Sequence, residues 1–220
     1  MSLIGVDVSH HQGIIDWKKV KQRGVTFAYI KASEGTIAQL DYLKANYAKA
    51  VQAGLLVGVY HFHRSNIDSS TQSAVFLNTL RTAGAQSAAL PPMIDVETPD
   101  NTPAETIKLR LSHSVQQVEA NLKVRTILYT NKNFWEENHL GDGFSGHSLW
   151  IARYLHDAPA QAVAPPASDI AQVKPPQGFT KWDIWQYSEK GRVSGITTNV
   201  DLDYFPGSLD QLKALKHTLP

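Results

Sequence analysis

The stretch FAYIKASEGTIAQLDYLKANYAKAVQAGLLVGVYHF, residues 27–62, decides the fold, because it contains a strand, a helix and a second strand. Residues 27–33 and 56–62 are apolar runs with the length and the β-branched or aromatic content of strands. Between them, residues 41–53 place several apolar side chains on one helical stripe, which stops at Gly54. Two strands joined by a helix run in parallel, so this stretch predicts a parallel sheet.

The same alternation continues outward. Strand-like runs occur at residues 4–9, 92–97, 125–130, 148–154, 183–188 and 200–205, and helical patterns at 16–24, 69–83, 103–122 and, more briefly, 131–138. After the fifth strand the helical pattern thins. Five prolines between residues 158 and 178 disfavour a long helix there, and the last two strands are joined by residues 189–199, too few for a helical crossover.

Eight strands with about five helices, concentrated in the first half, predict an α/β fold of one domain, an incomplete (β/α) barrel. A doubly wound open sheet is the alternative, but the first strand is not followed by a Gly-rich phosphate loop. The Pro-rich segment could also be a domain linker. We favour a long barrel loop, because strand patterns resume after it.

Composition excludes several classes of function. The chain has 220 residues, and 21 Lys and Arg nearly balance 20 Asp and Glu, so no nucleic-acid partner is expected. Cysteine is absent, which excludes disulfides, Cys-ligated metals and a thiol nucleophile. There is no apolar run of membrane-spanning length, and the N-terminus enters a strand without a signal peptide. We therefore expect no membrane insertion, and either export by another route or a leader already removed.

Four acidic residues fall at or near strand ends, where parallel barrels carry their active sites. Asp7 is near the end of the first strand, Asp95 and Glu97 end the fourth, and Asp201 lies in the eighth. Asp95 and Glu97 are two residues apart, so strand alternation points both to the same side. Paired carboxylates suit glycoside hydrolysis, in which one group donates a proton and the other stays ionised. Structural roles such as caps and ion pairs are the alternative for so short a pattern.

Aromatic and histidine residues leave two further interpretations open. The aromatic rings at late-strand positions suit the flat faces of sugars, although such rings also fill barrel cores; they are Tyr60, Tyr129, Trp150, Tyr154, Trp185 and Tyr187. His10, His11, His61 and His63 follow two strands and, with the acids, could form a metallohydrolase site, or else act as hydrogen-bonding groups. We expect no metal and no cofactor. A serine nucleophile is disfavoured, since the chain has no G-x-S-x-G motif.

An ordered set of motifs resembles the glycoside hydrolase family 25 lysozymes and runs from about residue 4 to residue 205. The motifs are GVDVSHHQG (5–13) followed by DW (16–17), FAYIKASEG (27–35), GVYHF (58–62), MIDVE (93–97), ILYT (127–130), LWIA (149–152), WQYS (185–188) and VD (200–201). The resemblance implies an irregular TIM-like (β/α)5(β)3 barrel. It also implies cleavage of the β-1,4 bond between N-acetylmuramic acid and N-acetylglucosamine in peptidoglycan.

Residue roles follow from the same resemblance. Glu97 matches the catalytic acid/base, and Asp95 matches the residue that assists the 2-acetamido group of the substrate, an exception to the scheme of two acting carboxylates. The positions that match the substrate-binding cleft are Asp7, Asp201, Glu34, Tyr60, Tyr129 and Gln186. The chain departs from the family at His11, where many members carry Trp, and at Ala38, where a bulkier residue is usual. These departures bear on substrate preference.

These observations lead to one assignment with two alternatives. Residues 1–220 are expected to form one catalytic barrel, with a core at about 4–205 and a C-terminal helix at about 208–217. The expected partner is the peptidoglycan glycan strand, hydrolysed by a monomer acting on the cell wall outside the cytoplasm. A glycosidase acting on chitin-type oligosaccharides and a non-enzymatic glycan-binding barrel are the alternatives.

Overall fold

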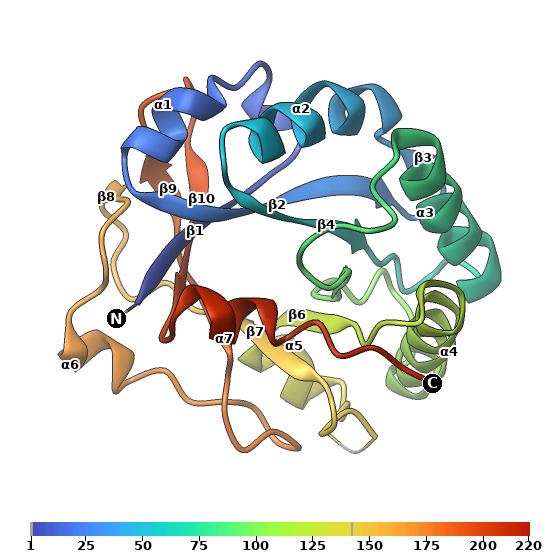
Figure 1. The fold of residues 1–220 in the computed structure, drawn as a ribbon. Coiled ribbons are helices and arrows are strands. Elements are labelled where there is room, and N and C mark those ends of the chain that lie inside the picture. The colour runs from blue at the N-terminus through green and yellow to red at the C-terminus, as the bar shows by residue number, and fades with distance from the viewer. Residues whose placement is uncertain (1, 142) are drawn as a thin grey trace.

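The computed structural model describes residues 2–141 and 143–220, and its centre is a closed barrel (Figure 1). The barrel strands are β1 (Leu3–Val8), β2 (Val25–Glu34), β4 (Leu56–Phe62), β5 (Met93–Asp95), β6 (Ile127–Asn131), β7 (Ser148–Ala152), β9 (Ile184–Arg192) and β10 (Val200–Phe205). They are hydrogen-bonded in the order β1-β10-β9-β7-β6-β5-β4-β2, and the pairing of β2 with β1 closes the ring.

Two short strands and the helices surround this barrel. β3 (Ile37–Ala38) extends the edge of β2, and β8 (Ala160–Gln161) pairs with β9. The helices are α1 (Trp17–Gln22), α2 (Leu40–Gln52), α3 (Ser69–Ala83), α4 (Ala104–Leu122), α5 (Lys132–Glu137), α6 (Ala167–Ile170) and α7 (Leu209–Lys213), with a 3-10 turn at η1 (His10–Gln12). Helices α1 to α4 cover one side of the barrel, and the side near β8 carries long loops and α6 (Figure 1).

Local sequence sets the helix boundaries. The side chain of Asp16 accepts a hydrogen bond from the backbone N–H of Lys19 and so caps α1, and Asp68 caps α3 in the same way. Helix α3 ends at Gly84, whose φ of 69° is a left-handed conformation that glycine adopts without strain. Caps at these positions fix where each crossover leaves its strand and therefore where the strand ends lie.

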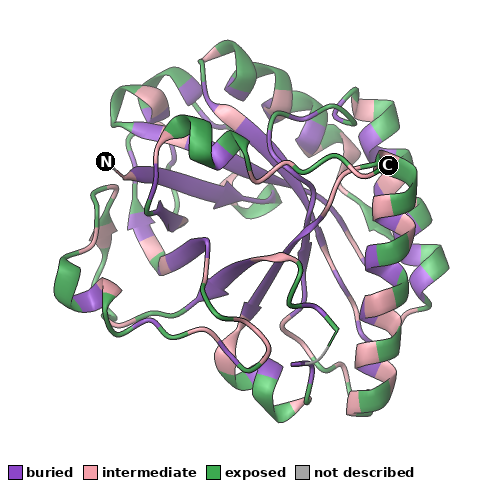
Figure 2. Ribbon diagram, turned by 60° about the horizontal axis from the view of Figure 1, so that its bottom comes forward, coloured by how far each residue is buried: buried purple, intermediate pink, exposed green. Residues whose placement is uncertain are grey.

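The core has a layer inside the barrel and a layer between strands and helices (Figure 2). Helix α4 buries an apolar stripe against the barrel, with Ile107 and Leu111 fully buried. Inside, Tyr29 and Trp150 pack edge to face, with ring centroids 4.8 Å apart. Gly58 leaves space for the Tyr29 ring, because an added Cβ would lie 2.3 Å from it. Side chains fill the interior, so the barrel is a packed core and not a pore. Side chains that a ligand can reach therefore lie at its mouth.

The sequence prediction of an irregular α/β barrel with eight strands is confirmed, and the structure adds two differences. First, β10 runs antiparallel to both β1 and β9, because the connection from Arg192 to Val200 is too short for a crossover. Second, the C-terminal helix is shorter than expected: α7 ends at Lys213. The chain then turns so that the carbonyl of His217 accepts from the backbone N–H of Arg125, at 2.9 Å. Within the described part of the chain, no helix has the length and apolarity needed to cross a membrane.

Candidate active site

The four acids gather at one mouth of the barrel because of strand direction. Asp7 lies near the end of β1, Asp95 ends β5, and Glu97 follows two residues later. Asp201 lies near the start of β10, and since β10 is antiparallel, its beginning is level with the end of β1: Asp201 pairs in register with Asp7. Asp201 therefore lies at the same mouth as Asp7, as the sequence led us to expect, but it reaches the mouth by the opposite strand direction.

Burial and mutual repulsion raise the pKa values of these acids. Burial raises the pKa of Asp95 well above its ordinary value, and the neighbouring charge of Glu97 adds to the effect. Burial also raises the pKa of Glu97, and the charge of Asp7 raises it further. The pKa of Asp7 rises to about 6, mainly through burial, and that of Asp201 rises well above the ordinary range for the same reason. Because these groups repel one another's charge, Asp95 and Glu97 share protons as a pair rather than ionising together.

A hydrogen-bond network fixes Asp7. The buried amide of Gln186 donates from Nε2 to Oδ2 of Asp7, at 2.6 Å. Its Oε1 accepts from the hydroxyls of Tyr129, at 2.8 Å, and Tyr154, at 2.5 Å. Both lone pairs of the amide oxygen are therefore used, which determines which way the amide faces. The network brings together Asp7, Tyr129 and Gln186, three of the residues expected from the sequence.

Tyr60 and Glu34 lie on the side of the mouth formed by β2 and β4. The Tyr60 ring is 6% exposed. Burial raises the pKa of its hydroxyl, and the nearby charges of Asp7 and Asp95 raise it further. Glu34 accepts from Nζ of Lys31 at 2.5 Å and also pairs with Arg64. These two cations lower the pKa of Glu34 despite its partial burial. Glu34 is therefore held as a carboxylate at the rim, in contrast to the acids within, whose pKa values are raised.

Two residues at the site, Lys31 and Asp203, were not singled out from the sequence. Lys31 is a buried cation whose charge lowers the pKa of Asp7, Asp95 and Glu97. Asp203 is fully buried behind the mouth, where burial raises its pKa well above the ordinary range. Its position two residues after Asp201 would have placed it on the same strand face. Tyr154, which the sequence analysis named as a late-strand aromatic ring, is 42% exposed, and its hydroxyl joins the network. The sequence contained no signal for that exposure.

The histidines do not gather as metal ligands. Within the described residues, no group of three or more His, Cys, Asp or Glu side chains is arranged to hold a metal ion. The ring of His61 is hydrogen-bonded on both nitrogens, by Ser33 at 2.8 Å and Gln72 at 3.0 Å. Burial lowers the pKa of His61 to about 4 and that of His63 to about 3. These two rings are neutral side chains packed outside the barrel wall, and His10 and His11 are exposed.

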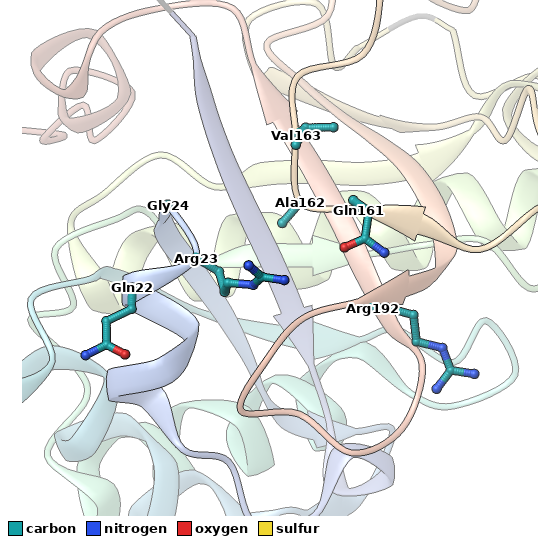
Figure 3. Close-up of a pocket in the computed structure, with 7 residues that line it drawn as sticks. All are labelled: Gln22, Arg23, Gly24, Gln161, Ala162, Val163 and Arg192. Carbon is teal, nitrogen blue, oxygen red and sulfur yellow. The ribbon is translucent and has the colours of Figure 1, made fainter.

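Two of the larger cavities among the described residues are candidates to hold a sugar. One, of about 650 Å³, is lined by Glu97 and Tyr154 and by residues that follow β6 and β7. The other, of about 470 Å³, lies between the end of α1, the segment after β8 and the end of β9; Figure 3 shows the side chains around it. No acidic side chain lines this second cavity. The cavity at Glu97 is therefore the candidate substrate site.

Comparison with known proteins points to one family. Residues 6–196 match the model for glycosyl hydrolases family 25. Lysozyme M1 of Streptomyces globisporus is 35% identical to this chain over 96% of the chain and 70% of that protein. An N,O-diacetylmuramidase of Arthroderma benhamiae is 25% identical, over 96% of this chain and 86% of that protein. A crystal structure of a bacterial lysozyme from Streptomyces coelicolor superimposes with a TM-score of 0.78 at 30% identity, covering 97% of this chain and 96% of that one.

Proposed function

The chain belongs to the glycosyl hydrolases of family 25 and is a peptidoglycan N-acetylmuramidase, in which, we propose, Glu97 is the acid/base and Asp95 assists the substrate. The bond cleaved is the β-1,4 bond from N-acetylmuramic acid to N-acetylglucosamine. The observation that carries the residue assignment is the position of Glu97. It is the one of the four mouth acids that lines the 650 Å³ cavity, and its pKa is raised by burial.

The raised pKa gives Glu97 the proton that the first step needs. Glu97 donates it to the glycosidic oxygen, and the carbonyl oxygen of the 2-acetamido group attacks the anomeric carbon as the bond to the leaving sugar breaks. Asp95 accepts a hydrogen bond from the acetamido N–H and offsets the positive charge that develops on that group. In the free protein burial raises the pKa of both groups, and that of Asp95 strongly, so the pair retains a proton. We assign that proton to Glu97 once the acetamido N–H of the substrate donates to Asp95, because this hydrogen bond favours the charged form of Asp95.

The second step returns the proton. The carboxylate of Glu97 takes a proton from water as the water oxygen attacks the anomeric carbon and the acetamido oxygen leaves. The configuration at that carbon is retained, because two displacements have occurred. Both steps use the same carboxyl, first as acid and then as base.

The remaining cleft residues are assigned to substrate binding. Asp7 and Asp201 present carboxyl groups at the mouth, and Gln186 and Tyr129 fix the orientation of Asp7. Tyr60 lies against the acids, and Glu34 forms a charged part of the rim. The described site residues all belong to one barrel, and we propose that residues 1–220 form a single catalytic barrel that works as a monomer.

A matched pair of variants tests this assignment. Glu97→Gln should abolish release of reducing ends from purified peptidoglycan, whereas Glu137→Gln, an exposed acid on α5, should leave that release at the wild-type level. Unchanged thermal unfolding of Glu97→Gln would show that the fold is intact. Near wild-type activity in Glu97→Gln would end its assignment. Faster turnover of chitin oligosaccharides than of peptidoglycan would instead favour a chitin-type glycosidase, and sugar binding without cleavage a glycan-binding barrel.

A further inference from the structure

The mouth of the barrel is divided by charge. The acids Asp7, Asp95 and Asp201 belong to β1, β5 and β10. Between β5 and β10 around the ring, Lys132 is the first residue after β6 and Arg153 is the first after β7. The strands β5, β6 and β7 are adjacent, so these side chains follow neighbouring strand ends. This side of the mouth is therefore cationic.

Three cations line the same cavity as Glu97. Lys132, Arg153 and Lys174 all contribute to its wall, Lys174 from the loop between α6 and β9. The volume of about 650 Å³ exceeds what one sugar ring needs and falls in the usual range for a ligand site. A ligand that reaches Glu97 therefore passes within the field of three positive charges.

These cations are only partly occupied by other groups. Nζ of Lys132 is 3.6 Å from a carboxylate oxygen of Glu136, in a pair that is exposed on both sides. Arg153 donates from Nη1 to the carbonyl of Gln172 at 2.6 Å, which holds the guanidinium in place without neutralising it. Lys174 is exposed, and no ion pair to it is found within residues 2–141 and 143–220. The structure therefore presents about two uncompensated positive charges to a ligand.

From this arrangement we infer that the cationic wall of Lys132, Arg153 and Lys174 binds the carboxylates of the peptide stems that peptidoglycan carries on its muramic acid residues. The inference rests on the proposed function, since it takes the glycan strand to lie at Glu97. The sugar backbone itself is uncharged, so it offers no anionic partner to three cations. Stem peptides carry free carboxylates beside the cleaved bond. Charge-assisted hydrogen bonds from Lys and Arg are the usual means of holding such groups.

The inference also predicts a preference for peptidoglycan over uncharged glycans. Chitin offers N-acetylated sugars but no anionic group, so it would gain nothing from this wall. Exposed ion pairs are individually weak and are screened by salt. We therefore expect a preference for charged stems of about tenfold in binding, which corresponds to about 1.4 kcal/mol.

The test measures binding rather than turnover, so that it does not depend on the catalytic assignment. Insoluble peptidoglycan is freed of phosphate polymers with hydrofluoric acid, and half of it is amidated at its carboxyl groups with ammonia and carbodiimide. Sedimentation gives the Kd of Glu97→Gln protein for each form. The expected ratio is about ten in favour of the charged form, falling towards one at high ionic strength.

Charge variants in the same background decide whether these three residues cause the preference. The triple variant Lys132→Gln, Arg153→Gln, Lys174→Gln should bring the ratio near one. The double variant that keeps Arg153, and with it the contact to Gln172, should give an intermediate ratio of about three. The control triple Lys18→Gln, Arg23→Gln, Lys49→Gln removes the same charge from exposed positions on α1 and α2 and the turn after α1, and should keep the ratio.

Several outcomes of these binding measurements would overturn the inference. A ratio near one in the unmodified background, or an unchanged ratio in the first triple variant, would overturn it. Glycan stripped of stems by an amidase keeps only the lactyl carboxylate; if it binds as tightly as intact peptidoglycan, the stem carboxylates are not the ligand and the inference is wrong. Failure of the proposed function has a different signature, namely no reducing ends released by the wild type whatever the binding ratio.

Discussion

Asp7→Asn is expected to make the protein more stable at neutral pH while impairing catalysis. Asp7 is 6% exposed and its pKa rises from 3.8 to about 6, mainly because burial disfavours the charged form. A group whose folded pKa exceeds its unfolded pKa stabilises the fold when protonated. That stability is complete below about pH 3.8 and is lost as the pH rises through about 6.

The magnitude follows from the shift. At about 1.36 kcal/mol per pKa unit, ionised Asp7 lowers the free energy of unfolding by about 3 kcal/mol at pH 7.5 and by about 0.5 kcal/mol at pH 4. Asparagine cannot ionise, so the variant should be more stable by those amounts. Its side-chain oxygen can still accept from Gln186, and its amide can donate to Asp201. The network is therefore preserved, while the carboxyl that meets the substrate is gone.

Urea unfolding followed by tryptophan fluorescence measures this difference at both pH values. Glu137→Gln, an exposed acid, is the control and should change the free energy of unfolding by less than about 0.5 kcal/mol. A variant that is less stable than the wild type at pH 7.5 would refute the reasoning. So would a gain of equal size at pH 4 and pH 7.5, because the effect would then not arise from ionisation of Asp7.

Three further predictions concern packing, pH dependence and metals. Gly58→Ala should lower the free energy of unfolding by about 1–3 kcal/mol, since the new Cβ would lie 2.3 Å from the Tyr29 ring. At Gly146 the nearest neighbour of a new Cβ would be 3.8 Å away, so Gly146→Ala should have little effect on thermal unfolding. Because Glu97 acts protonated, activity should fall as pH rises past its raised pKa. Removing the nearby cation in Lys31→Met should move that fall to higher pH; a fall at unchanged or lower pH would count against Glu97 as the acid. Excess chelator should leave the release of reducing ends unchanged, and a loss restored by added zinc would reopen the metal interpretation.

The sequence predicted the barrel because its elements are locally encoded. The apolar runs, the cap at Asp16 and the stop at Gly84 each act over a few residues, and periodicity records them directly. The direction of β10 was less accessible, because it depends on how a short connection closes the ring. The two-residue strands β3 and β8 carry no periodicity at all, since each exists only through its pairing with a longer neighbour.

The site was predictable to the extent that it lies at strand ends. Asp95 and Glu97 stand out by spacing and Tyr129 as a late-strand aromatic ring, and the family resemblance added Gln186. Lys31 was not recognised, because a lysine in an apolar run gives no indication that it faces a group of acids. Nor could the sequence show the cationic wall, since Lys132, Arg153 and Lys174 are separated along the chain and meet only where β6, β7 and a loop converge.

The most direct test of the central claim is mass spectrometry of digested peptidoglycan after borohydride reduction, with Glu97→Gln treated in parallel. The account predicts products whose reduced end is muramic acid from the wild type, and no products from the variant. Products reduced at glucosamine would contradict cleavage of the bond from N-acetylmuramic acid to N-acetylglucosamine, and muramic-acid-ended products from the variant would contradict the role of Glu97.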